Sequence, residues 1–125
     1  MSYLKPLNQR TVAANLDIAG AALTAALMIP NSTWLCLEGT FVAFDVTLPT
    51  VAQMVTAYGG GVQANLNGMT FTFKRDLAQL GVVRILPGGA DFIDGVNAAG
   101  GGFSLAAVND SVTLGISAAA NWVVI

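Results

Sequence analysis

The chain reads Phe92-Ile93-Asp94-Gly95, then Ser111-Val112-Thr113-Leu114, then Asn121-Trp122-Val123-Val124-Ile125 in its last third. Each segment combines β-branched or aromatic residues with neighbouring turn residues, which is typical of short strands. The last segment finishes on the final residue, so we expect a sheet to hold this end of the sequence. Together the three segments favour a β-scaffold.

Segments of the same kind occur upstream. Residues 41–48 alternate in polarity, which predicts a half-buried strand. Its apolar face carries Val42, Phe44, Val46 and Leu48. Asn67-Gly68, a pair typical of hairpin turns, precedes a second alternating segment over residues 69–74. Further strands are predicted over residues 34–38, 81–86, 91–94, 103–106, 111–116 and 121–125. This pattern predicts an all-β fold, a jelly-roll or β-sandwich-like domain.

One short helix is expected among the strands. Pro49 ends the strand that precedes it, and Thr50 can cap its first turn. Gly59-Gly60-Gly61 ends it. One helical face then carries four larger side chains: Val51, Met54, Val55 and Tyr58.

The first 30 residues differ in composition from the rest. We therefore divide the chain into an extended apolar N-terminal arm, residues 1–30, and a β-domain, residues 31–125. The Ala-rich segment 11–28 allows a helix, whereas Gly20 favours two strands, over residues 11–16 and 22–29. Both interpretations stay open, with strands favoured. An arm this apolar is expected to be covered by a neighbouring subunit, through Val12, Leu16, Leu23 and Leu27.

Composition points to assembly. Charged residues make up 10% of the chain, against about 25% in an ordinary globular domain, and hydrophobic residues make up 54%. A monomer of this composition would leave large apolar areas in water, so a homo-oligomer is expected. The net charge is −2, and Lys74-Arg75 is the only adjacent basic pair. We therefore expect no nucleic-acid partner.

Catalysis and cofactors are disfavoured by the residue inventory. The chain has no His, which catalytic triads and most metal sites require, so no enzymatic activity and no cofactor are expected. Cys36 has no second Cys and lies in an apolar run, where it is expected to be a core residue. Asp91 and Asp94 would fall on opposite faces of a strand, which disfavours a metal site.

No membrane partner and no secretory signal are expected. The uncharged run over residues 18–29 is shorter than the roughly 20 residues that a spanning helix needs. Asn15 and Asp17 interrupt the sequence that follows the first basic residues, which is not typical of a signal peptide. A soluble protein is predicted.

The order of five motifs resembles a small β-domain of tailed-phage virions. That domain recurs in head decoration proteins and in trimeric fibre and spike tips. The motifs are Thr47-Leu48-Pro49, Val83-Arg84-Ile85-Leu86-Pro87-Gly88-Gly89, Ile93-Asp94-Gly95, Ser111-Val112-Thr113-Leu114 and Asn121-Trp122-Val123-Val124-Ile125. The resemblance covers about the last 80 residues. It leaves residues 1–38 unexplained and departs from the family pattern over residues 50–66.

The resemblance implies a homotrimer on the virion surface. A capsid decoration or cement protein that binds the major capsid protein is the favoured function, because a β-domain behind an apolar arm leaves no room for a fibre shaft. The protein would then occupy the host cytoplasm during assembly and the capsid surface afterwards. The alternative is a receptor-binding or tail-fibre tip protein that recognises host glycan through residues 95–102. The residues that carry the family motifs are Leu48, Pro49, Ile93, Asp94, Gly95 and Trp122.

Overall fold

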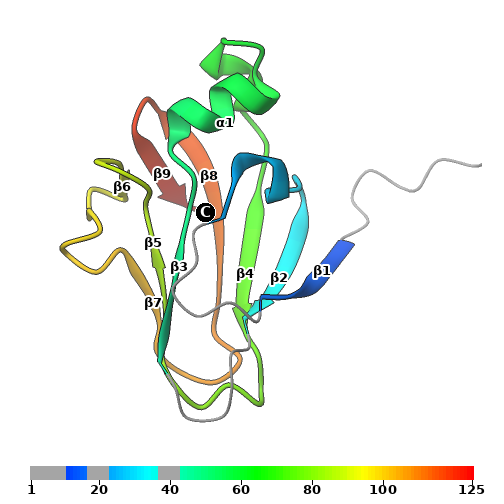
Figure 1. Cartoon of the computed structure of the whole chain (residues 1–125), viewed down its shortest axis with the longest axis vertical. Helices are drawn as coiled ribbons and strands as arrows, with labels where there is room; N and C mark the ends of the chain where they lie inside the picture. The colour runs from blue at the N-terminus through cyan, green and yellow to red at the C-terminus, as the bar shows by residue number, and fades with distance from the viewer. Residues whose placement is uncertain (1–10, 17–22, 37–42) are drawn as a thin grey trace, which may run out of the picture.

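Nine strands and one α-helix make up the chain (Figure 1). The structure, a computed structural model, describes residues 11–16, 23–36 and 43–125. The strands are β1 (Thr11–Leu16), β2 (Ser32–Cys36), β3 (Phe44–Thr47), β4 (Phe71–Arg75), β5 (Val83–Leu86), β6 (Phe92–Ile93), β7 (Phe103–Leu105), β8 (Ser111–Ala118) and β9 (Asn121–Val124). The helical segments are α1 (Val51–Tyr58) and two 3-10 turns, η1 (Ala25–Leu27) and η2 (Gln63–Leu66).

The strands form two sheets. The larger has the order β1-β2-β4-β8-β9-β6, and the smaller has the order β3-β5-β7. Four neighbouring pairs run parallel: β1 with β2, β2 with β4, β3 with β5 and β6 with β9. The other three pairs are antiparallel. As a result, β1, β2, β4, β6 and β9 all begin at the same end of the larger sheet, which is the end that α1 occupies (Figure 1).

One hydrophobic core takes side chains from both sheets. In the larger sheet, Trp34 of β2 stacks on Phe73 of β4 with ring centroids 5.2 Å apart. Phe71 meets the edge of Trp122 at 5.9 Å. Because β3 alternates, its Phe44 and Val46 turn toward the same core while the residues between them stay half-buried.

The all-β prediction is confirmed, since two sheets account for the chain apart from α1 and two 3-10 turns in the described residues. The strand predicted over residues 41–48 is β3, with its predicted apolar face buried at Phe44, Val46 and Leu48. Val42 lies outside the described residues. The predicted helix is α1, with Thr50 as its N-cap and Gly59 as its C-cap. Trp122 and Cys36 are core residues, as predicted.

The hairpin prediction at Asn67-Gly68 is wrong. Asn67 has φ −61° and ψ 132°, Gly68 has φ 84°, and the Met69 amide donates to the Leu66 carbonyl at 3.1 Å. This is the pattern of a type II turn, which needs positive φ only at its third residue. The turn joins η2 to β4, and the antiparallel partner of β4 is β8, about 40 residues away.

The N-terminal expectations are partly correct. The strand over residues 11–16 is β1, whose backbone pairs in parallel with β2. The strand predicted over residues 22–29 is wrong, because residues 25–27 form η1 and Leu23 bonds as a single amide to the Thr47 carbonyl at 2.8 Å. Alanines explain the difference, since they favour tight helical turns over strands. The division into an arm and a β-domain at residue 30 stays a prediction.

Candidate functional site

Pockets gather around α1. Three of them, of about 420, 430 and 330 Å³, are lined in part by residues 49–57, the approach to α1 and most of its length. Helix α1 lies across one end of the strands, so these hollows surround a single part of the molecule (Figure 1). This α1 end is the candidate functional site.

The first turn of α1 is held by three hydrogen bonds. The Gln53 amide donates to the Thr50 hydroxyl at 3.1 Å, and the Thr50 amide donates to the Gln53 side-chain oxygen at 2.9 Å. The Val51 amide donates to a carboxylate oxygen of Asp91 at 2.6 Å. These contacts satisfy amides that a helix leaves without an internal partner. The N-terminus of α1 is therefore rigid, and it is anchored to the segment just before β6.

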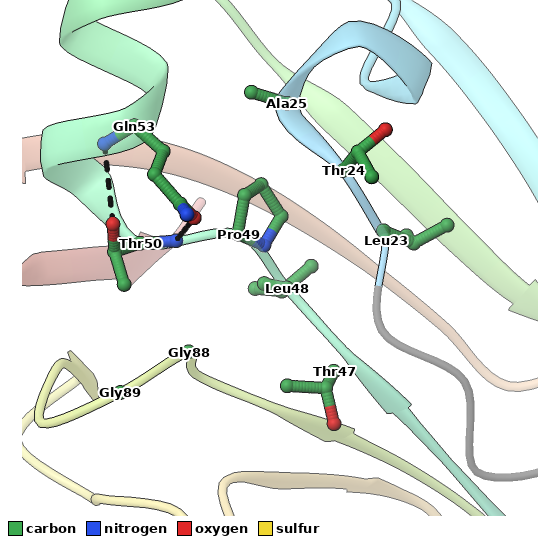
Figure 2. Close-up of a pocket in the computed structure, with 10 residues that line it drawn as sticks. All are labelled: Leu23, Thr24, Ala25, Thr47, Leu48, Pro49, Thr50, Gln53, Gly88 and Gly89. Carbon is green, nitrogen blue, oxygen red and sulfur yellow. Dashed lines mark hydrogen bonds between the residues drawn. The ribbon is translucent and has the colours of Figure 1, made fainter.

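The largest hollow on one side of α1 surrounds Pro49 (Figure 2). Leu23, Thr24 and Ala25 lie on one side of Pro49 and Gly88 and Gly89 on the other. We call it the Pro49 pocket. Its lining residues are Leu23, Thr24, Ala25, Thr47, Leu48, Pro49, Thr50, Gln53, Gly88 and Gly89. None of the ten carries a charge, so the pocket suits a neutral group rather than an ion.

Gly88 allows the walls of the Pro49 pocket to approach each other. A Cβ atom at this position would overlap the Leu48 carbonyl oxygen and come within 3.0 Å of the Thr50 amide nitrogen. Any larger residue would therefore push the Leu48-Pro49-Thr50 backbone away. The Leu-Pro and Pro-Gly-Gly motifs, about 40 residues apart in sequence, thus meet in one place.

The second hollow, which we call the Asp91 pocket, lies on another side of α1. Asp91 is the only charged residue in its lining. The lining residues are Val51, Ala52, Val55, Gly61, Gln63, Asp91, Ala119 and Ala120. The carboxyl group is 8% exposed, so its charge is largely removed from water. Sequence reasoning missed this site because Asp91 and Val51 are 40 residues apart.

The remaining motif residues have structural roles. Ile93 and Trp122 are buried and pair with each other in the β6–β9 register. Asp94 accepts a hydrogen bond from the Val124 amide at 3.2 Å. Asp94 and Gly95 have φ 48° and 81°, so they form the tight corner that follows β6. Asp94 and Asp91 therefore bind different amides, and in the described residues no group of three or more potential metal ligands occurs.

The four arm residues occupy different environments. Leu23 is buried in the core of its own chain, where little of it is left for contact with a neighbour. Leu27 is about half exposed. Val12 and Leu16 lie in β1, at an edge of the larger sheet. The structure thus places these residues in two groups rather than on one continuous surface.

Reactive chemistry is weak at the α1 end and elsewhere. Cys36 is fully buried, and burial raises the pKa of its thiol to about 12. Arg84 pairs with Asp45 through two hydrogen bonds of 2.7 Å on the exposed face of the smaller sheet, and this bonding raises the pKa of Arg84. Across the described part of the chain, no helix is long and apolar enough to cross a membrane.

Comparison of the chain with protein-family models, curated proteins and solved structures finds no match. What the α1 end can do is therefore argued from its geometry. Neutral walls around Pro49 and a single buried carboxylate in the neighbouring pocket fit binding of a polypeptide segment better than bond-breaking chemistry, which needs convergent reactive groups.

Proposed function

We propose that this protein is a non-enzymatic structural protein of a phage virion, and that it decorates the capsid as a homotrimer. Its fold would be a β-sandwich that carries an apolar N-terminal arm. The sandwich is the better of the two predicted architectures, because the parallel strand pairs depart from the antiparallel pattern of a jelly roll. The major capsid protein would be its partner.

The observation that supports assembly most directly is an inverted loop between β4 and β5. Leu77 is 68% exposed and Leu80 is about half exposed, while Arg75 and Gln79 are buried. Folding normally places residues the other way round, because burying a charge costs free energy and burying leucine gains it. A loop that reverses this order presents an apolar surface in a fixed shape, which is typical of a contact site.

Arg75 fixes the shape of that loop. Its guanidinium donates to four backbone carbonyls, those of Gln79, Leu80, Leu105 and Ala106, at 2.6–3.2 Å. The loop therefore loses little conformational entropy when it binds, which favours affinity. Leu77 and Leu80 are expected to contact another protein, either a second copy or the capsid.

The first experiment is light scattering of the purified chain, which measures its mass in solution. A mass of three chains supports the proposal, and binding of the trimer to capsids in a co-sedimentation assay tests the location. A stable monomer that does not bind capsids would refute it. Removal of residues 1–29 is expected to abolish attachment to capsids, and normal attachment of the truncated trimer would contradict the role of the arm.

The inverted loop is tested by Leu77→Ser, with Leu23→Ser as the matched control. Leu77→Ser should leave the urea midpoint almost unchanged and weaken trimer formation or capsid binding. Leu23→Ser should lower the urea midpoint, because Leu23 is buried in the core. Equal assembly of Leu77→Ser and the unchanged protein would remove this loop from the contact.

The alternative function is glycan recognition at the tip of a receptor-binding protein. The loop over residues 95–102 is mostly exposed and supplies Asn97, whose side chain caps its own turn through the Gly100 amide at 2.8 Å. Neither tryptophan is available for stacking on a sugar, since Trp34 and Trp122 are both buried. Binding to a glycan array without binding to capsids would favour this alternative.

A further inference from the structure

We infer that the Asp91 pocket receives the Lys5 side chain from the N-terminal arm of a neighbouring copy. The inference rests on the proposed homotrimer and specifies how its subunits are linked. It follows from three features of the molecule: the chemistry of the pocket, the distribution of charge along the chain, and the position of the pocket relative to the start of β1.

The pocket combines one carboxylate with apolar walls. Val51 and Val55 of α1 form one wall, and Ala119 and Ala120, in the turn between β8 and β9, form another. Its volume of about 430 Å³ exceeds that of an amino-acid side chain. A cationic group on an apolar stem matches this lining, and a lysine side chain has both parts.

Asp91 retains bonding capacity. One oxygen accepts the Val51 amide of α1, and no second hydrogen bond to Asp91 occurs among the described residues. The other oxygen belongs to the wall of the pocket. A carboxylate that is 8% exposed and has a single amide donor is incompletely compensated for the loss of water. A cation in the pocket would complete its environment.

The chain's own cations are already accounted for, except in the arm. Arg75 binds backbone carbonyls, and Arg84 pairs with Asp45. Lys74 lies on β4 beside Arg75, at the end of the larger sheet opposite α1. The two other basic residues of the sequence are Lys5 and Arg10, both within the ten residues that precede β1. Charge complementarity therefore points to the arm.

The topology brings the arm of one copy to the pocket of the next. Strand β1 begins at the same end of the larger sheet as β6 and β9, which the pocket adjoins, but β1 and β6 are opposite edges of that sheet (Figure 1). Five strand intervals separate these edges, about 24 Å. The six residues from Lys5 to Thr11 extend over at most about 20 Å, so the arm falls short of its own pocket.

A ring of copies removes this mismatch. When the β1 edge of one copy faces the β6 edge of the next, the arm begins beside its neighbour's pocket. A contact between two different surfaces of identical chains closes into a ring when the rotation between copies is suitable, and three copies give a trimer. Each copy then donates one Lys5 and offers one Asp91 pocket, so every pocket is filled.

Cross-linking tests the route of the arm. Lys5→Cys is combined with Gln63→Cys, on the pocket wall, and the protein is treated with a short bismaleimide. Cys36 can stay in place, because burial and a raised thiol pKa keep it unreactive. Covalent dimers and trimers on a denaturing gel are the expected result. Each single variant serves as a control for links that do not involve the pocket.

Charge removal tests the chemistry of the contact. Asp91→Asn keeps an oxygen for the Val51 amide, and Lys5→Met keeps the apolar stem. Each variant should raise the concentration at which the trimer dissociates by roughly tenfold or more, because one partner of a desolvated pair is lost. The double variant should be no weaker than either single variant. Arg10→Met, the matched control, should behave like the unchanged protein.

The outcomes separate this inference from the proposed function. A trimer that gives no links between residues 5 and 63 and is unaffected by Asp91→Asn overturns the inference and leaves the homotrimer standing. A product linked only within one chain also overturns it. A protein that is monomeric at every concentration tested overturns both proposals.

Discussion

Arg75 and Asp91 are two buried charges at opposite ends of the larger sheet, and they are compensated to different degrees. Arg75 is 4% exposed and donates to four carbonyl groups, whereas Asp91 is 8% exposed and accepts from one amide. Neither has an opposite charge beside it among the described residues. The comparison shows that backbone dipoles alone can satisfy a buried charge, and that their number decides whether the site is closed or still able to bind.

The two ends also differ in what they present to solvent. Around Arg75 the surface is convex and apolar, with Leu77 and Leu80 exposed. Around Asp91 the surface is hollow, with a carboxylate in its wall. We expect the Arg75 end to act as a preformed contact surface and the Asp91 end to act as a receptor for a side chain. The following predictions test this difference, from the largest expected effect to the smallest.

Both ends depend on one core, which Trp122→Ala should disrupt. Trp122 is fully buried and packs against Phe71, so the variant should lose about 3–5 kcal/mol of unfolding free energy. Urea denaturation followed by circular dichroism measures the loss, and assembly should fail with it. An unchanged urea midpoint, with loss of ligand binding alone, would place the indole at the surface and contradict the structure.

Arg75→Met should destabilise the chain by about 3 kcal/mol, since several buried carbonyls lose their donor at once. Protection of the amides of residues 76–80 from hydrogen exchange should fall in the same variant. Arg84→Met is the control, because its guanidinium is exposed and has one carboxylate partner. If the two variants shift the urea midpoint equally, the Arg75 end is not held by its carbonyl contacts.

Thr50→Ala should cost about 1 kcal/mol, the usual loss for an N-cap. The Gln53 amide then loses its acceptor, while the Asp91 bond to Val51 is retained. Urea denaturation gives the cost. Thr56→Ala, whose hydroxyl donates only to the Ala52 carbonyl within α1, is the comparison variant and should change stability little. A larger loss in Thr56→Ala would show that the helix end is not where α1 is fixed.

Cys36 predicts a small loss of stability in alkali. Its thiol pKa is raised from 9.0 to about 12 in the folded chain, so the unfolded chain releases this proton more readily. The folded state is therefore favoured by the neutral thiol below pH 9, and stability falls as the pH rises from about 9 toward 12. Urea midpoints at pH 8 and 10 measure the effect. Cys36→Ala should lose this part of the pH dependence.

Local pattern predicts local structure well in this chain. The alternation at Phe44 and Val46 and the cap at Thr50 depend on residues within one or two turns of each other, and both predictions are confirmed. The hairpin at Asn67-Gly68 failed because only Gly68 takes positive φ, a distinction that the residue pair does not encode. The alanines of residues 25–27 likewise form a 3-10 turn where a strand was expected.

The candidate site depended on contacts that no local pattern contains. Asp91 reaches Val51 across 40 residues, and Arg75 reaches Leu105 and Ala106 across about 30. Both side chains bind backbone atoms, which every residue possesses, so their partners leave no mark in the sequence. A signal did exist in the loop after β4, where the order Arg75, Leu77, Gln79 and Leu80 lacks the periodicity of either a strand or a helix.

The order of strands also bears on how the chain folds. Only β8 and β9 are consecutive in sequence and paired as a hairpin, while the smaller sheet pairs no consecutive strands at all. Most sheet contacts therefore require closure of long loops, which slows folding toward the millisecond-to-second range. The larger sheet also stays split until β8 and β9 arrive between β4 and β6. A ribosome must therefore release these late residues before the sheet can close, and until then its unpaired strands are exposed to aggregation.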